Sequence, residues 1–279
     1  MKFEPRLVWL VALPVEARPL CQLFGLSPCT QSMPFPTYVS ACGRQLLVVS
    51  GLGRNLAAAA AMHAYHELGG GAHIAWLNVG IAGHGHHPLG SAWLVDQVVE
   101  SSSGARFYPQ PVVRYPFPLN PLTTVDVPQG TMADGSLYDM EASGFFQIAS
   151  RLSSSELVSM VKIVSDHGVD QSSFPSRDQV SDWIKDHEAG LRQLADSMLA
   201  LSAEESQRLE PIELDLATLS LHFTVTQQHQ LRTICRRWNA LGLAGSPLAK
   251  VSAYPTASDA LKSLRQQVDG EIIDWTQNE

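Results

Sequence analysis

Three acidic residues, Glu16, Glu141 and Asp166, stand close to points where the sequence changes from a strand pattern to a helix or a loop. Tyr138 and Met140 alternate with polar neighbours before Glu141, and apolar residues recur at helical spacing after it. A carboxylate at such a junction is held on rigid backbone and can accept two hydrogen bonds at once, as a ribose cis-diol requires. Taken alone, Glu141 also fits an ordinary first-turn glutamate that the helix dipole favours.

Two glycine-containing turns resemble the three carboxylates in that they also follow strand patterns. Glu16 and Asp166 each follow an apolar run that is typical of a buried strand, and the turns 51–53 and 80–83 follow two further strands of this kind. Ligands of open α/β sheets bind at the C-terminal ends of the strands. We therefore expect these segments and Glu141 to converge on one site.

The elements that must position these residues alternate along the chain. Strand patterns cover residues 6–13, 38–41, 45–50, 73–79, 91–100, 122–125 and 160–165. Helix patterns cover residues 15–24, 139–151 and 176–201, and an alanine-rich helix is expected to begin with Asn55 as its N-cap and to stop at glycines 69–71. This alternation predicts an α/β fold with a mostly parallel, twisted, central mixed sheet that is flanked by helices.

The composition changes after about residue 203. The rest of the chain has two helix patterns, 227–241 and 258–268, and we expect it to form a mainly helical C-terminal extension. The predicted domains are therefore 1–203 and 204–279. The first of the two helices carries Arg232, Arg236 and Arg237, which fit a solvated helix face better than a nucleic-acid contact because the whole chain is acidic.

Four short motifs stand in a characteristic order. They are 12–17 (Ala-Leu-Pro-Val-Glu-Ala), 78–83 (Asn-Val-Gly-Ile-Ala-Gly), 139–142 (Asp-Met-Glu-Ala) and 161–167 (Val-Lys-Ile-Val-Ser-Asp-His). In this order, the chain from Val8 to Ala200 resembles the purine nucleoside phosphorylase and nucleosidase superfamily, and it is most similar to methylthioadenosine/S-adenosylhomocysteine nucleosidases. The resemblance implies a nucleoside phosphorylase-like fold and cleavage of the N-glycosidic bond of a purine nucleoside or a 5′-substituted adenosine.

This reaction needs an acid for the leaving base, support for an oxocarbenium-like sugar, and a nucleophile at the anomeric carbon. By the resemblance, Asp166 is the general acid that donates to the purine N7, and Glu16 is the base that activates water. Glu141 and Met140 would bind the ribose, and Ser165 would orient Asp166. The other substrate-binding residues that the resemblance implies are Gly53, Ala82, Gly83 and Lys162.

Departures from the family pattern keep two alternatives open. Ile81 replaces a serine that helps to hold the water, and Lys162 replaces an arginine. Related phosphorylases carry a Gly-Asp-Pro-x-x-Arg signature where residues 13–18 read Leu-Pro-Val-Glu-Ala-Arg, so hydrolysis is favoured over phosphorolysis. Arg54 could still supply a guanidinium for phosphate at the mouth of its helix. The other alternative is a nucleoside-binding or regulatory protein without catalytic power, with the extension as its interaction module.

The charge of the chain limits its partners. Its 279 residues include 19 Lys and Arg against 27 Asp and Glu, which gives a net charge of −8. This charge argues against nucleic acid or an anionic membrane as the main partner. We expect a small nucleoside as the ligand and no cofactor, and the resemblance implies a homo-oligomer, namely a dimer.

The cysteines and histidines give weaker indications. The four cysteines form no C-x-x-C pair, which favours free thiols and a cytoplasmic setting. The early apolar run 7–15 is too short to span a bilayer and fits a buried strand. His84, His86 and His87 have no acidic or cysteine ligand at a familiar zinc spacing, so we expect a solvent-lined loop and no metal. The sequence leaves the role of His167 open.

Overall fold

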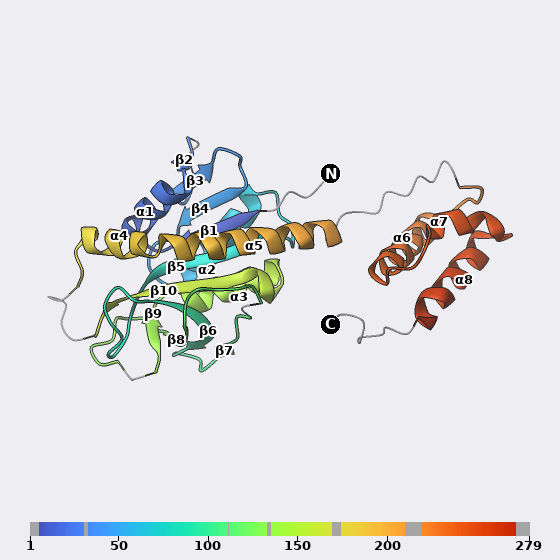
Figure 1. Cartoon of the computed structure of the whole chain (residues 1–279). Coiled ribbons are helices and arrows are strands. Elements are labelled where there is room, and N and C mark those ends of the chain that lie inside the picture. The colour runs from blue at the N-terminus through green and yellow to red at the C-terminus, as the bar shows by residue number, and fades with distance from the viewer. Residues whose placement is uncertain are drawn as a thin grey trace. The chain divides into compact units, whose positions relative to one another are not determined.

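The computed structural model describes residues 6–30, 33–110, 112–132, 135–168, 174–209 and 219–271. The chain divides into two compact units, Met1–Glu210 and Pro211–Glu279 (Figure 1). Helix α5 (Glu188–Leu209) runs through residue 203, where the change in composition led us to place the domain boundary. The division between the units therefore comes after the end of this helix.

The described part of the first unit is built on one mixed sheet of ten strands. The strands are β1 (Leu7–Val11), β2 (Leu26–Pro28), β3 (Thr37–Ser40), β4 (Gln45–Val49), β5 (Ala75–Gly83), β6 (Ala92–Glu100), β7 (Arg106–Phe107), β8 (Leu119–Thr124), β9 (Leu137–Asp139) and β10 (Val158–Asp166). Their order is β10-β6-β8-β9-β5-β1-β4-β3-β2, and β7 pairs with β6. Because β10 also pairs with β5, the strands β5, β10, β6, β8 and β9 close into a ring. The central strands β4, β1, β5 and β10 are parallel, which confirms the predicted α/β fold.

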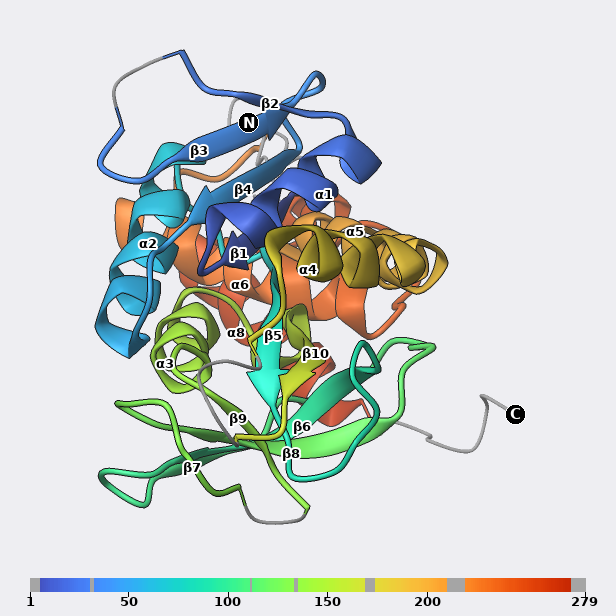
Figure 2. The ribbon, with the colours of Figure 1, turned by 90° about the vertical axis from the view of Figure 1, so that its left-hand side faces the viewer.

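Helices cover both faces of the central strands. Helices α1 (Pro14–Phe24), α4 (Arg177–Asp186) and α5 pack on one face, and α2 (Arg54–Glu67) and α3 (Ala142–Leu152) pack on the other (Figure 2). Strand β1 shows why its sequence is a continuous apolar run. Trp9 faces the core on the α1 side, whereas Val8 and Leu10 face the core on the α2 side. A strand that is buried on both faces favours apolar side chains at every position.

Glycine residues set the end of helix α1 and the start of helix α2. Helix α1 begins with Pro14 in its first turn and ends at Gly25, whose φ of 63° lies in the left-handed region that glycine favours. Helix α2 begins at Arg54 with Gly53 as its N-cap, so the expectation that Asn55 caps this helix is wrong. Gly53 has a φ of 101°, and this conformation turns the chain from β4 into the helix two residues earlier than a cap at Asn55 would.

Two other predicted helices have different bounds. The expected helix 176–201 is divided into α4 and α5 at His187, whose Nε2 lies 2.7 Å from the carbonyl oxygen of Gly90. The expected helix 139–151 begins only at Ala142, because residues 137–139 form β9 and pair with β5 and β8. Strands β2 and β7 were not expected, since three and two residues are too short for a periodic pattern.

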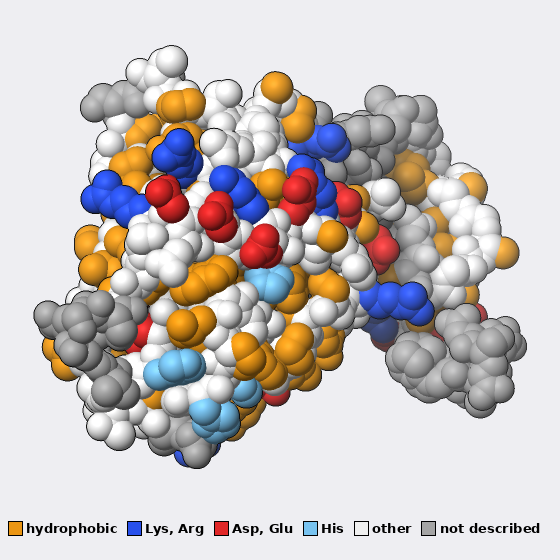
Figure 3. Space-filling view, turned by 60° about the vertical axis from the view of Figure 1, so that its left-hand side comes forward, with side chains coloured by type: hydrophobic (Ala, Val, Ile, Leu, Met, Phe, Trp, Pro, Cys, Tyr) orange, Lys and Arg blue, Asp and Glu red, His pale blue; other side chains and the backbone are white. Residues whose placement is uncertain are grey.

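The solvent-facing sides of α4 and α5 carry charges at helical spacing. Lys185 Nζ lies 3.9 Å from Asp182 Oδ1, and Arg192 Nε lies 2.8 Å from Glu188 Oε1. Figure 3 shows acidic and basic side chains intermixed on one face of the molecule. Exposed pairs of this kind contribute little to stability. Across the described ranges, none of the helices has both the length and the apolar character that crossing a membrane would require.

The second unit is a small helical bundle with its own core. It contains α6 (Val225–Ala240), α7 (Pro247–Lys250), the 3₁₀ helix η4 (Val251–Ala253) and α8 (Ala257–Gly270), so both predicted helices form. Leu231, Trp238 and Leu264 are among the side chains that pack between α6 and α8. Arg237 Nη1 lies 2.7 Å from Asp269 Oδ1 on the other helix.

Candidate active site

A cavity of about 570 Å³ lies at the C-terminal ends of the central strands. Its described lining comes from the segment after β1, the end of β5, the loop after β8, the junction of β9 with α3, and the end of β10. The lining residues include Glu16, Ala82, Gly83, Asp139, Met140, Glu141, Ser165 and Asp166. The fold therefore brings seven of the nine candidate site residues to one cavity, although they are far apart in sequence.

Glu16 lies in the first turn of α1 and is 1% exposed. Its Oε2 accepts the backbone N–H groups of Ala12 and Leu13 at 2.9 and 2.8 Å, and its Oε1 accepts the N–H of Ile81 at 2.9 Å. A carboxylate has about four acceptor positions, so roughly one stays available toward the cavity. Burial raises the pKa of Glu16, while these hydrogen bonds and the charge of Lys162 oppose the rise.

Glu141 is the N-cap residue of α3 and is 5% exposed. Its Oε1 accepts the backbone N–H of Gly53 at 2.8 Å, and its Oε2 accepts the N–H of Met140 at 3.4 Å. Burial, and then the neighbouring charge of Asp139, raise the pKa of Glu141 to about 7, and Lys162 opposes this rise. The carboxyl group can therefore exchange a proton near neutral pH.

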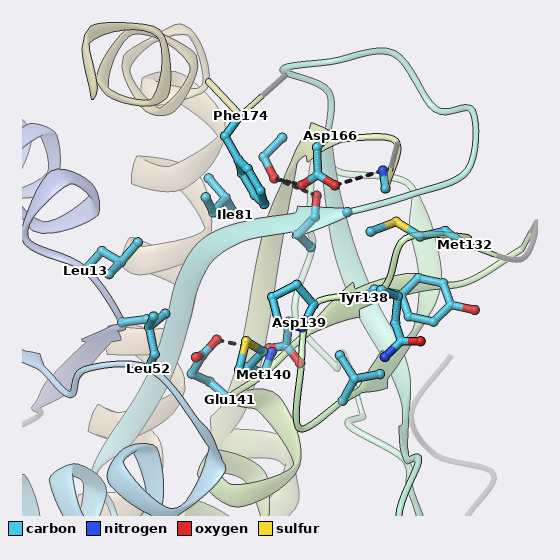
Figure 4. Close-up of a pocket in the computed structure, with 18 of the residues that line it drawn as sticks. Leu13, Leu52, Ile81, Met132, Tyr138, Asp139, Met140, Glu141, Asp166 and Phe174 are labelled. Atoms are coloured by element: carbon cyan, nitrogen blue, oxygen red, sulfur yellow. Dashed lines mark hydrogen bonds between the residues drawn. The ribbon is translucent and has the colours of Figure 1, made fainter. Parts of the chain in front are cut away.

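Asp166 ends strand β10 at a point where the register with β5 shifts. Ser165 donates its hydroxyl to Oδ2 of Asp166 at 2.8 Å, and the backbone N–H of Gly168 donates to Oδ1 at 3.0 Å. Figure 4 shows Asp166 and Glu141 at opposite ends of the pocket. A ligand between them would meet one carboxyl group at each end.

The walls between the two ends are largely apolar. Leu13, Leu52, Ile81 and Phe174 lie along one side of the pocket in Figure 4, and Met132 and Tyr138 lie along the other. Leu52 is 55% exposed and Phe174 is 51% exposed, so this rim is open to solvent. Flat apolar walls of this kind suit an aromatic base or an apolar substituent.

Met132 packs against the backbone of Gly83 and Gly168, beside Asp166. A Cβ atom on Gly83 would lie 2.1 Å from Met132 Cε, and one on Gly168 would lie 3.1 Å from Met132 Cγ. Glycine at these positions therefore allows the thioether to lie close against the backbone beside Asp166. Sequence reasoning missed Met132, because the loop that carries it has no periodic pattern.

Two candidate residues lie behind the cavity and not on its surface. Lys162 is 1% exposed, and its Nζ lies 2.9 Å from Asp139 Oδ2, so the expectation that Lys162 contacts the ligand does not match its position. Gly53 reaches the site through its hydrogen bond to Glu141. Sequence reasoning gave no role to Asp139, although a lysine inside an otherwise apolar strand requires a buried anion.

The histidine loop differs from its expected form. His84 is fully buried, stacks on the ring of His87 at 3.6 Å, and accepts the backbone N–H groups of His86 and His87 at Nδ1. His87 in turn stacks on Trp93 at 3.9 Å. The solvent-lined loop that we expected is therefore wrong for His84. Within the described ranges, no group of three or more His, Cys, Asp or Glu side chains is arranged to hold a metal ion.

His167 and the cysteines also have defined surroundings. His167 Nδ1 lies 2.8 Å from the carbonyl oxygen of His84, so this ring ties the end of β10 to the histidine loop. Such a contact fits the orienting role that the sequence left open. All four cysteines, Cys21, Cys29, Cys42 and Cys235, are free thiols.

The guanidinium group of Arg54 is not placed to bind a phosphate ion in the cavity. Its guanidinium forms ion pairs with Glu100 and with Asp126, the latter at 3.4 Å, and it donates to Ser102 Oγ at 2.7 Å. It does not line the cavity. Two carboxylates already satisfy this cation, and recruiting it for another anion would require breaking these pairs.

Comparison with known proteins supports the fold. No protein-family model and no curated protein sequence matches the chain. Solved structures do match it, and one is a 5′-methylthioadenosine/S-adenosylhomocysteine nucleosidase from Helicobacter pylori with butyl-thio-DADMe-Immucillin-A, at 13% identity and a TM-score of 0.58 over 70% of this chain and 99% of that chain.

Two further structures give the same result. The 5′-methylthioadenosine nucleosidase of Arabidopsis thaliana matches at 20% identity with a TM-score of 0.54, over 71% of this chain and 96% of that chain. The futalosine hydrolase of Helicobacter pylori matches at 13% identity with a TM-score of 0.54, over 68% of this chain and 97% of that chain. The chain therefore shares the fold of these nucleosidases and of futalosine hydrolase, which agrees with the fold that its motifs predict.

Proposed function

We propose that this protein hydrolyses the N-glycosidic bond of a purine nucleoside or a 5′-substituted adenosine. The observation that carries the proposal is that Glu16, Glu141 and Asp166 line one cavity, with Glu141 and Asp166 at its opposite ends. A nucleoside has a basic nitrogen at one end and a cis-diol at the other, and these groups need carboxyl partners about one nucleoside length apart. The fold that the chain shares with solved nucleosidases adds support.

In this proposal Asp166 is the general acid. Its carboxyl group would give a proton to the leaving base, while the Ser165 hydroxyl and the Gly168 N–H hold it in place at 2.8 and 3.0 Å. Protonation of the base withdraws electrons from the glycosidic bond and allows it to break. The sugar then carries the oxocarbenium-like charge, which the surrounding carboxylates stabilise.

Glu16 is the proposed base. Its raised pKa brings the carboxylate closer to the basicity that deprotonating a water requires, and one acceptor position is left after its three backbone hydrogen bonds. Glu141, with Met140 beside it, would bind the ribose hydroxyls. A diol would offer Glu141 two donors in place of the weak 3.4 Å contact with Met140 N–H.

Hydrolysis is favoured over phosphorolysis on electrostatic grounds. Four carboxyl groups line the cavity, namely those of Glu16, Asp139, Glu141 and Asp166, and those that are ionised and not paired with a cation would repel a phosphate ion. Arg54, which could have supplied a guanidinium, is already paired with Glu100 and Asp126. Phosphorolysis and nucleoside binding without turnover remain as alternatives that an assay separates.

The test is a panel of purine nucleosides and 5′-substituted adenosines, each incubated with and without phosphate and analysed for released base and sugar. The proposal predicts free base and free sugar at a rate that does not depend on phosphate. Glu188→Gln, at a partly exposed position on α5 outside the cavity, is the matched control and should behave as the wild type. A sugar 1-phosphate would establish phosphorolysis instead, and saturable binding with no released base would establish the binding protein.

The homo-oligomer that the resemblance implies also stays a proposal. Helix α2 presents two exposed apolar side chains, Leu56 and Met62, which are 46% and 47% exposed, and Leu52 in the loop before the helix is 55% exposed. Light scattering coupled to size-exclusion chromatography would test whether the protein is a dimer, whose expected mass is twice 30.4 kDa. Met62→Lys should shift the equilibrium toward the monomer if this face is the interface, because a buried unpaired charge opposes association.

A further inference from the structure

A buried ion pair joins Asp139, which lines the cavity, to Lys162, which lies behind it. The side chains of Lys162 and Asp139 are 2% and 0% exposed, and their charged atoms Nζ and Oδ2 are 2.9 Å apart. Asp139 also accepts the hydroxyl of Thr124 at Oδ1 and the backbone N–H of Ala142 at Oδ2, both at 2.9 Å. Three donors therefore hold the carboxylate of Asp139, and it in turn fixes the position of the ammonium group.

The ammonium group faces Glu16 across a glycine. Lys162 and Gly80 are direct neighbours in the register of β10 and β5. A Cβ atom on Gly80 would lie 3.0 Å from Glu16 Oε1 and 3.6 Å from Lys162 Nζ. The absence of a side chain at Gly80 thus leaves the path between the two charges open, and charge interactions across buried protein are weakly screened.

The charges around Lys162 come from three different elements. Asp139 ends β9, Glu141 caps α3 and Glu16 lies in α1, and all three raise the pKa of Lys162, which burial alone would lower. In return, Lys162 opposes the effect of burial on the pKa of Glu16 and of Glu141. One cation therefore serves three carboxylates in a region from which water is nearly excluded.

We propose that Lys162, held in place by Asp139, is a positioning residue whose buried charge keeps both Glu16 and Glu141 ionisable. It acts through these two carboxylates and does not contact the ligand. The expected effect of Lys162 on the rate of turnover rests on the proposed hydrolysis. The competing explanation is a purely structural ion pair, which an apolar pair of similar size could replace without effect on the carboxylates.

The decisive measurement uses the protein alone. Carboxyl ¹³C signals of labelled glutamate are followed through a pH titration, and Glu16→Gln and Glu141→Gln assign the two signals. In Lys162→Met, both midpoints should rise, by roughly one to three pH units, because an opposite charge nearby has been removed. In Asp139→Asn, the midpoint of Glu141 should fall, because a neighbouring negative charge has been removed.

The double variant Asp139→Asn/Lys162→Met covers the case in which Lys162→Met does not fold. It removes both members of the ion pair, so neither position 139 nor position 162 keeps an unpaired buried charge that would favour misfolding. The midpoint of Glu16 should rise as in Lys162→Met, while that of Glu141 should stay near its wild-type value because two opposing effects are lost together. A wild-type midpoint for Glu16 in a folded double variant would overturn the proposal.

Two further variants separate charge from shape. Lys162→Arg keeps the positive charge and should keep both midpoints, and Lys185→Met removes a lysine from an exposed pair on α4 and should change neither. In turnover, the acidic limb of the kcat/KM profile should move to higher pH in Lys162→Met and return in Lys162→Arg. If the wild type cleaves no nucleoside, the proposed function fails while the titration still decides the role of Lys162.

Discussion

Gly53 donates its backbone N–H to Oε1 of Glu141 over 2.8 Å, and this bond joins the N-terminus of α2 to the start of α3 at the cavity. The two helices approach so closely here that a Cβ atom on Gly144 would lie 2.0 Å from the carbonyl oxygen of Arg54. The proposed ribose end of the site therefore depends on a helix crossing that only glycine permits.

Replacing Gly144 with alanine should weaken both the fold and the site. The clash is with backbone, which cannot rotate away, and overpacking of this kind costs about 1–3 kcal/mol. We expect a lower free energy of unfolding in urea and a raised KM for the nucleoside, because Gly53 moves away from Glu141. Gly270→Ala, at a position with open space around it, is the control. Unchanged stability of Gly144→Ala would show that the helices separate at no cost.

Asp166→Asn should remove most turnover and leave nucleoside binding intact. An amide cannot give a proton to the leaving base, and general acid catalysis contributes roughly 10²–10⁴-fold to the rate. The measurements are kcat from released base and the Kd of a non-cleavable nucleoside. Asp178→Asn, at an exposed position in α4, is the matched control. Base release at the wild-type rate would refute the assignment of the acid.

Glu16→Gln should abolish the hydrolysis that the wild type carries out. A neutral amide cannot take the proton of water, although its one carbonyl oxygen can still accept the N–H groups of Ala12 and Leu13, which share a single oxygen of Glu16. The readout is free sugar, measured with and without phosphate. If sugar 1-phosphate accumulates and the rate rises with phosphate, then hydrolysis is the wrong reaction, and Arg54→Ala is the next variant to examine.

The pKa of Glu141 predicts a pH dependence of stability. A carboxyl group whose pKa is raised to about 7 in the folded state binds more protons than the unfolded chain does between its ordinary pKa of 4.5 and pH 7. The contribution of Glu141 to stability is therefore present below pH 4.5 and is lost as the pH rises through about 7. Urea unfolding at a series of pH values should show this fall in the wild type.

Glu141→Gln should flatten this dependence, because an amide does not titrate. The variant should gain stability relative to the wild type at pH 8, where the wild type has a buried carboxylate at this position. Glu188→Gln, at its partly exposed position, should follow the wild-type curve. A Glu141→Gln curve parallel to the wild type throughout would show that another group causes the fall.

The alternation of strands and helices, the two-sided burial of β1 and the placement of Glu16, Glu141 and Asp166 at strand ends could all be predicted from the sequence. These features depend on the spacing of apolar residues along the chain and on the rule that parallel strands carry their sites at one edge. The order of the four motifs also predicted the nucleoside phosphorylase-like fold. The helix stops at Gly25 and at glycines 69–71 were also predictable, because left-handed backbone favours glycine.

The tertiary structure decided the rest. The sequence shows that Lys162 lies in an apolar strand. Only the fold, in which β10 and β9 both pair with β5, determines that Asp139 is its partner. In the same way, one helix becomes two at His187, and only the structure shows that the ring of His187 lies 2.7 Å from the carbonyl oxygen of the distant Gly90. Periodicity is a property of neighbours along the chain. Burial and the pairing of charges depend on which distant segments meet, and no local pattern contains that information.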